Sequence, residues 1–325
     1  MSALAPTPSL TVAERKLGDR LGDPALRLLT WLASGACMVL IALLVYKVFA
    51  QAGQSISNFG LGFVTSSEWN PVKGHFGAAT FIYGTAVSSA IALLIAGPMS
   101  IAIALFLTEL APLRIRRPVA TLVELLAAIP SVVLGLWGIL ILAPFIEGTL
   151  EPALQSTLGW IPLFGGTPSP FGLLPAILIL TIMAVPIVAA VTREVFETVP
   201  TELKESALAL GSTRWEMVRM VILPYSKSGI VGASILGLGR ALGEAIAVTQ
   251  VIGGAVGIHA SLFAPADTLA SRVASEYQGA TTTLQTSSLA YLAAILLVFA
   301  LIVNTAARLI VRRSTRRLRV RPADT

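Results

Sequence analysis

The sequence predicts an all-α, polytopic membrane protein with six transmembrane helices. Of its 325 residues, 55% are hydrophobic and only 12% are charged, and the mean hydropathy is +0.82. Soluble domains carry about 25% charged residues, so this composition argues against a large soluble core. Several apolar runs also approach about 20 residues, the length at which a helix crosses the hydrocarbon core of a bilayer.

Six apolar runs fit membrane-spanning helices, and together they define a transmembrane domain over 28–310. The runs cover 28–50, 81–107, 119–146, 171–192, 229–253 and 288–310. The first run has no clear small-residue cleavage site at its end, so we interpret it as an uncleaved signal-anchor. We expect 1–27 to form a cytosolic N-terminal segment and 311–325 a basic cytosolic tail.

The basic residues predict the orientation of these helices. Most of the 23 Lys and Arg residues lie before the first run, after the second, after the fourth and in the tail, whereas the alternate loops hold only Lys73 and Arg272. Because cytosolic loops are enriched in Lys and Arg, both termini are predicted to be cytosolic. This distribution at the ends of the spans is typical of contact with membrane lipid and does not indicate a nucleic-acid-binding surface.

A polar loop at 193–228 separates the fourth and fifth runs. Its pattern predicts two short helices that meet at Gly211, with Pro224 ending the second one before the fifth span. Amphipathic spacing alone is typical of an ordinary solvated connector, but a rigid pair of helices could also fit a groove on another protein and transmit force. The residues that define the pattern are Glu205, Ser206, Ala207, Gly211, Val221, Leu223 and Pro224.

The fifth run contains a charged pair, Arg240 and Glu244, one helical turn apart on the same face. An arginine at the centre of a membrane helix costs about 2.5–3.5 kcal/mol and faces protein or water. Three interpretations remain open: a structural ion pair, an anion-attracting Arg240 held by Glu244, or a Glu244 that also accepts a hydrogen bond from a protonated substrate. Gly239 and Gly243 lie beside the pair and would let a helix of a second subunit approach closely.

Few other residues suggest chemistry. Glu124 lies inside the third run, where pairing with a basic neighbour is favoured over lining an inner vestibule. His75 and His259 lack metal-ligand spacing and a matching nucleophile, and Cys37 lies in an apolar run. We therefore predict no catalytic residue, no metal site and no cofactor. The chain also has no GxxxxGK[ST] sequence, so if transport is driven by ATP, the nucleotide is bound and hydrolysed by a partner subunit and not by this chain.

Four stretches resemble permeases of bacterial phosphate importers of the ATP-binding-cassette (ABC) class. They are Ser66–Pro71 leading to Phe81–Thr85, Ala128–Gly138, Glu205–Pro224 and Gly239–Ala245. Ser206 and Val221 depart from the family pattern conservatively. The resemblance implies a type I importer fold in the bacterial inner membrane, with the loop at 193–228 taking up motion from an ATPase. It also implies a heterodimer with a PstA-like permease, two PstB-like ATPase subunits and a periplasmic PstS-like phosphate-binding protein.

The predicted function is thus that of a permease subunit for inorganic phosphate, forming half of an alternating-access pathway. A permease for another oxyanion, such as sulfate or molybdate, is an alternative from the same class. An ion-gradient-driven carrier or channel would need no ATPase-docking loop. A membrane enzyme is a third class, but it would require catalytic groups for which the sequence offers no pattern.

Overall fold

The computed structural model describes residues 17–316. Within that range, six helices are long and apolar enough to cross a membrane, which confirms the predicted fold class. They cover Pro24–Phe59, Ala79–Leu110, Ser131–Leu158, Leu173–Glu197, Arg214–Gly243 and Thr283–Leu309. The described β structure consists of a two-residue antiparallel ladder, in which Trp69 pairs with Phe76 and Asn70 with His75, and an isolated bridge between Gly253 and Ala266.

The chain divides into two units, one ending at Ala50 and the other beginning at Gln51. The first unit is described as one helical segment, the N-terminal part of α1 (Leu17–Phe59). Its described side chains are exposed, apart from the half-buried Val45 and Val48. Apolar side chains on all sides of a helix suit a lipid environment, because lipid tails cover such a surface without cost.

The second unit contains the remaining elements. In chain order these are α2 (Gly62–Thr65), β1 (Trp69–Asn70), β2 (His75–Phe76), α3 (Ala79–Leu105), η1 (Phe106–Leu110), α4 (Leu113–Ala127), α5 (Ser131–Trp137), η2 (Gly138–Leu142), α6 (Ala143–Phe145), η3 (Ile146–Leu150), α7 (Glu151–Leu158), η4 (Pro162–Phe164), α8 (Leu173–Glu197), α9 (Thr201–Ala209), α10 (Arg214–Met217), η5 (Val218–Ile222), α11 (Leu223–Gly243), α12 (Ile246–Val251), α13 (Leu269–Glu276), η6 (Tyr277–Gly279) and α14 (Thr283–Arg316).

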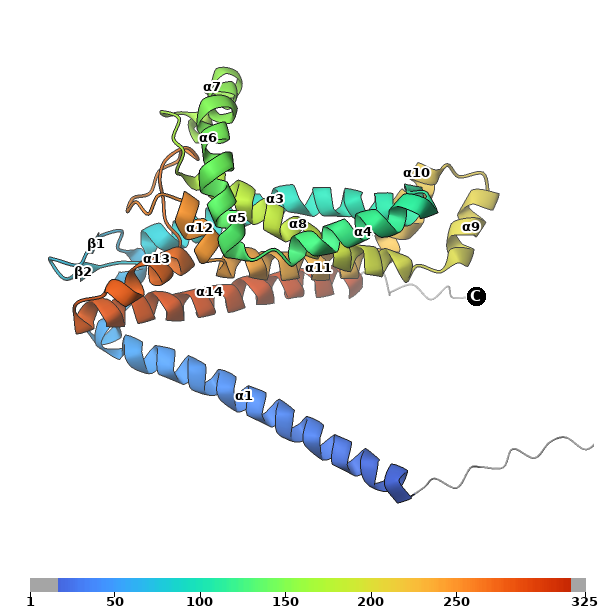
Figure 1. Cartoon of the computed structure of the whole chain (residues 1–325), viewed down its shortest axis with the longest axis horizontal. Helices are drawn as coiled ribbons and strands as arrows, with labels where there is room; N and C mark the ends of the chain where they lie inside the picture. Colours follow the sequence, from blue (N-terminus) through green and yellow to red (C-terminus); the bar gives the residue numbers. More distant parts are fainter. Residues whose placement is uncertain (1–16, 317–325) are drawn as a thin grey trace, which may run out of the picture. The chain divides into compact units, whose positions relative to one another are not determined.

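The core of this unit lies around α8, which packs against α3, α11 and α4 (Figure 1). About two thirds of the most apolar part of α8 is buried, at 67%. Small residues permit this close packing, since an added methyl group at Gly237 of α11 would strike the Val188 side chain of α8. The Ser100 hydroxyl of α3 also donates a 3.0 Å hydrogen bond to the Val185 carbonyl of α8.

Two helix boundaries differ from the predicted spans. The predicted span 119–146 is divided, because α4 ends at Ala127 and a new helical segment begins after Pro130 and continues to Leu158. A proline lacks the backbone N–H that would continue the helix, and the residue before it disfavours helical geometry. The predicted span 229–253 is also divided, since α11 ends at Gly243 and α12 begins at Ile246.

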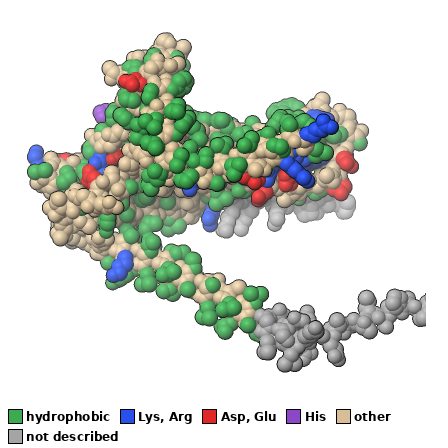
Figure 2. All heavy atoms as spheres, viewed as in Figure 1, with side chains coloured by type: hydrophobic (Ala, Val, Ile, Leu, Met, Phe, Trp, Pro, Cys, Tyr) green, Lys and Arg blue, Asp and Glu red, His purple; other side chains and the backbone are tan. Residues whose placement is uncertain are grey.

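Charged and apolar side chains occupy different parts of the second unit. Figure 2 shows acidic and basic side chains gathered around α9 and α10, whereas hydrophobic side chains cover much of the visible surface over α4 and α5. The exposed apolar residues of these helices include Leu122 and Leu125 of α4 and Val133 of α5. A surface of this kind is suited to lipid or to a second apolar protein surface.

We predict that Gly84→Ala destabilises the protein by about 1–3 kcal/mol, because the new methyl group would collide with the backbone carbonyl of Asp267, which cannot move as a side chain would. Gly97→Ala in the same helix is the matched control, since its added methyl group meets nothing within 4 Å. Thermal unfolding of the two purified variants checks the prediction. An unchanged melting temperature for Gly84→Ala would contradict the close approach of α3 to the 267 backbone.

Candidate functional site

The break between α11 and α12 carries the predicted charged pair. Glu244 leaves the helical conformation, with φ −72° and ψ 120°, directly after the last turn of α11. Its Oε1 atom accepts a 3.3 Å hydrogen bond from the backbone N–H of Ala247, in the first turn of α12. The same carboxylate faces back toward Arg240, whose Nη2 atom lies 3.6 Å from Oε2. Glu244 therefore interacts with both sides of the helix break.

The two members of this pair differ in accessibility. The Arg240 side chain is 39% exposed, whereas the Glu244 side chain is only 8% exposed. The Glu244 carboxylate already lies near a guanidinium and a backbone N–H, so part of its capacity to accept hydrogen bonds is filled. The Arg240 guanidinium has five N–H donors. The structure thus brings Arg240 and Glu244 together, as the sequence predicted, and leaves the arginine as the more accessible group.

The glycines of α11 face two different environments. Methyl groups added at Gly229 and Gly237 would collide with Val195 and Val188 of α8. Methyl groups added at Gly232, Gly239 and Gly243 would meet nothing within 4 Å. The second set forms an open glycine face of α11 beside Arg240.

The predicted two-helix segment after the fourth span consists of α9 and α10. Its turn requires Gly211, whose φ of +88° is rarely adopted by residues with a side chain. The Gly211 and Ser212 N–H groups bond back to the Leu208 and Ala207 carbonyls at 3.0 and 3.2 Å. Thr213 then starts α10 with a capping box, in which its hydroxyl and backbone N–H exchange hydrogen bonds with Glu216.

The exposed part of this segment is α9, where Glu205 and Ser206 are exposed and Ala207 is half-buried. Its other predicted residues connect the segment to the bundle: Val221 and Leu223 pack against a core cluster that includes Val218 and Ile222. The prediction that Pro224 ends the second helix is wrong. The chain passes through the π-helical turn η5 into α11, and Pro224 lies in the first turn of α11, where its missing N–H is tolerated.

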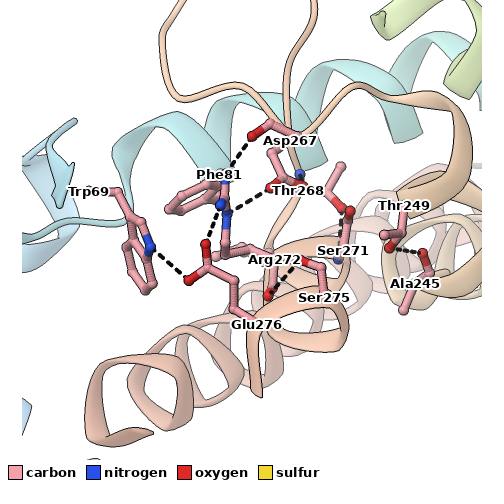
Figure 3. A network of polar contacts seen from close by, with 12 residues as sticks. Trp69, Phe81, Ala245, Thr249, Asp267, Thr268, Ser271, Arg272, Ser275 and Glu276 are labelled. Atoms are coloured by element: carbon pink, nitrogen blue, oxygen red, sulfur yellow. Dashed lines mark hydrogen bonds and ion pairs between the residues drawn. The ribbon is translucent and has the colours of Figure 1, made fainter. Parts of the chain in front are cut away.

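A buried polar network lies around Arg272, beside the N-terminal end of α3 (Figure 3). The Arg272 guanidinium lies 2.7 Å from the Asp267 carboxylate and 2.5 Å from that of Glu276, and it donates a 2.8 Å hydrogen bond to the Gly254 carbonyl. It also lies over the ring of Phe81, with 4.9 Å from the guanidinium carbon to the ring centroid. The indole of Trp69 donates to Glu276 at 3.0 Å. Arg272 thereby joins α13, α3, the β1 segment and the chain after α12.

Burial raises the pKa of the Asp267 carboxyl, against the opposing effect of the Arg272 guanidinium. An open pocket of about 370 Å³ borders the network and is lined mainly by small or polar groups, among them Thr249, Gln250 and Ser275. Sequence reasoning missed this network, because it treated Arg272 only as a basic residue of an external loop. The i,i+4 spacing of Arg272 and Glu276 was a usable signal.

Glu124 pairs with Arg193 of α8, with 3.0 Å between Oε1 and Nη2. Because α4 is separate from the following span, Glu124 belongs to an amphipathic helix and not to the span in which it was predicted. Among the described residues, no group of three or more His, Cys, Asp or Glu side chains is placed to hold a metal ion.

The family of binding-protein-dependent transport system inner membrane components matches residues 98–320, a range that includes α9, α10, Arg240 and Arg272. The chain belongs to this family. The permease is 48% identical over 85% of its length to the phosphate transport system permease protein PstC of Mesorhizobium japonicum, covering 86% of that protein. It is 43% identical over 97% of its length to PstC of Xylella fastidiosa, covering 98% of it. The predicted resemblance to phosphate-importer permeases is therefore confirmed.

Solved structures resemble the permease in fold. A bacterial ABC transporter for the import of alginate covers 90% of the permease and 99% of its own matched chain, with a TM-score of 0.56 and 22% identity. The alginate transporter in complex with its pentasaccharide-bound periplasmic protein gives a TM-score of 0.58 at 20% identity, over 93% of the permease and 98% of the matched chain. The permease is thus a multi-pass inner-membrane protein with the fold of ABC-importer permeases.

We predict that Arg272→Met lowers the free energy of unfolding by about 3–5 kcal/mol, because it leaves the carboxylate of Asp267 buried without its partner. Adding Asp267→Asn should restore part of the loss, since the double variant no longer buries an unpaired Asp267 charge. Thermal or denaturant unfolding of the two single variants and the double variant checks this coupling. Additive losses in the double variant would contradict it.

Proposed function

We propose that the permease imports inorganic phosphate as one half of a translocation pathway that a separate ATPase drives. The observation that carries this proposal is the position of Arg240, a partly exposed cation beside the open glycine face of a membrane-spanning helix. Membrane-embedded arginines face protein or water, and they occur where ions and substrates pass. The names of the two PstC relatives support phosphate as the anion.

Within this pathway, we assign Arg240 to the anion and Glu244 to the support of Arg240. A phosphate oxygen requires N–H donors, which the guanidinium provides in a planar fork. The Glu244 carboxylate is nearly buried and already lies near the Arg240 guanidinium and the Ala247 N–H. It holds the arginine in place and caps the first turn of α12, and it does not need to meet the substrate.

The open glycine face of α11 supports a second permease subunit as the partner there. Glycines at Gly239 and Gly243 allow two backbones to approach closely, which drives helix association in a bilayer where the hydrophobic effect between helices is absent. A PstA-like subunit packed on this face would enclose Arg240 from the other side. The translocation pathway then lies between two subunits, and this chain provides half of it.

The α9–α10 segment supports docking of two PstB-like ATPase subunits, one on each permease subunit. Glu205 and Ser206 are exposed on α9, and Leu210 is 88% exposed at the turn that follows. ATP would be hydrolysed by those ATPase subunits, and this segment would be cytosolic, with both termini on the same side of the membrane. The opposite end, which includes β1, β2 and α13, would then meet a periplasmic PstS-like binding protein.

The direct test is reconstitution of the permease with its candidate permease, ATPase and phosphate-binding partners in liposomes. ATP-dependent phosphate uptake is the expected result, and sulfate and molybdate should compete weakly. Preferential uptake of another oxyanion would replace phosphate as the substrate. Transport at a full rate by this chain alone, without an ATPase, would contradict the proposal that a separate ATPase subunit drives transport.

We predict that Arg240→Ala lowers phosphate uptake about 10- to 100-fold, because a hydrogen bond to a charged group is worth about 1.5–3 kcal/mol. Arg240→Lys keeps the positive charge and should retain part of the uptake. Membrane insertion and co-purification of the ATPase, measured on the same preparations, should be unchanged. Normal uptake by Arg240→Ala would exclude a substrate role for this residue.

We predict that Gly211→Leu uncouples ATP hydrolysis from transport or weakens ATPase binding, because a φ of +88° strains a residue with a branched side chain by about 1–3 kcal/mol. Gly211→Asn is the matched control, since asparagine adopts positive φ more readily. The number of phosphate ions transported per ATP measures the coupling. Equal coupling in the two variants and the wild type would contradict the role of this turn.

A further inference from the structure

The α9 helix is attached to the bundle at few points. None of its residues is buried, and it packs mainly against α10 and η5, with Ala207 reaching the neighbouring core cluster. A groove of about 510 Å³ separates it from the end of α3, with Leu105 and Leu110 on one side and Leu208 on the other. The α9 helix thus reaches α3 in two ways: through the apolar cluster that Ala207 shares with Ala104 of α3, and through a polar contact across the groove.

That contact is the ion pair between Lys204 and Glu109. The Lys204 Nζ atom lies 2.6 Å from Glu109 Oε1, and the two side chains are only 17% and 15% exposed. Among surface ion pairs, the median contribution to stability is about 0–1 kcal/mol, but screening by solvent is weaker where both groups are largely covered. Both charged groups also line the groove, so the pair bridges α9 and η1 across it.

Glu109 lies in a hydrogen-bonded helical turn at the end of α3. It lies in η1, the π-helical turn that extends the helix to Leu110, and the Ala111 N–H closes that turn on the Phe106 carbonyl at 2.7 Å. The Thr108 carbonyl accepts a hydrogen bond from the Arg116 guanidinium at 2.5 Å. A force on the Glu109 carboxylate is thus carried by α3 and by the start of α4, and not by a loose loop.

The opposite end of α3 is fixed to the network around Arg272. The Thr85 hydroxyl accepts a 2.9 Å hydrogen bond from the Leu269 N–H at the start of α13, and Phe81 lies under the Arg272 guanidinium. Arg272 in turn holds the Gly254 carbonyl, which follows α12. The continuous helix from Ala79 to Leu110 therefore connects α9 to the segment that continues from Glu244.

We propose that the Lys204–Glu109 ion pair is a strut that transmits movement of α9 to α3, which makes both residues positioning residues for coupled transport. This inference rests on the proposed function, in which α9 receives the movement of an ATPase. Movement of α9 could also pass directly through η5 into α11, without the ion pair. The two routes predict different behaviour when the ion pair is removed, because only the strut route depends on charge at Lys204.

The test uses the full complex in liposomes, with the binding protein, and measures phosphate ions transported per ATP hydrolysed. Lys204→Met should lower this ratio about tenfold while ATP hydrolysis and ATPase co-purification persist, a loss equivalent to about 1.4 kcal/mol of coupling. The exchanged pair, Lys204→Glu with Glu109→Lys, should restore most of the ratio, whereas Lys204→Glu alone should not. Lys227→Met, which removes an exposed lysine from the start of α11, is the control for loss of positive charge and should leave the ratio unchanged.

The outcomes separate this inference from the proposed function. If the unmodified complex transports no phosphate, the proposed function fails. If the unmodified complex is coupled and Lys204→Met remains equally coupled, the strut is wrong and the route through η5 suffices. Loss of the ATPase from Lys204→Met without recovery in the exchanged pair would show that Lys204 contacts the ATPase, which also overturns the strut. Where a single variant does not accumulate in the membrane, the exchanged pair decides between these results.

Discussion

Charged groups in a membrane protein must be satisfied by the protein itself, because the hydrocarbon core offers them no water. The second unit pairs charged groups at three levels along the bundle: Lys204–Glu109 beside α9, Arg240–Glu244 at the helix break that ends the fifth span, and Arg272 between Asp267 and Glu276. The first and third groups are largely covered within this chain. Arg240 keeps 39% of its side chain exposed, so the middle level is where an arginine can still receive a partner from outside the chain.

Helix packing follows the same logic, because apolar side chains gain little from leaving lipid for another apolar surface. Close approach through small residues then provides much of the attraction. In α11, Gly229 and Gly237 pack closely against α8. A methyl group added at Gly232, Gly239 or Gly243 would contact nothing within 4 Å. The α11 helix thus has two glycine faces, one that packs against α8 and one that is open in the described part of the chain. Arg240 lies beside the second face.

Hydropathy predicted six helices because each helix depends on its local composition. The α9–α10 turn was predictable because a positive φ favours a glycine, and Gly211 is visible in the sequence. The break at Glu244 was not predictable in this way, since Gly243 alone is common within membrane helices and the break depends on contacts made by α12. The third span was misplaced because α4 is apolar on one face and precedes Pro130. Arg272 was missed because burial in a connecting segment depends on tertiary packing with Phe81 and Asp267, which composition does not report.

The position of Glu244 links the conformation of the helix break to the state of Arg240. Its two carboxylate oxygens face different partners, the Ala247 N–H of α12 and the Arg240 guanidinium of α11. A movement of α12 relative to α11 changes the distance from Glu244 to one of them, and a weaker hold on the guanidinium leaves more of its donors for an anion. A ligand shifts a conformational equilibrium only by its difference in affinity for the two states. An anion that competes with Glu244 for Arg240 would provide such a difference, so substrate occupancy and the geometry of the break would depend on each other without any further charged residue in the span.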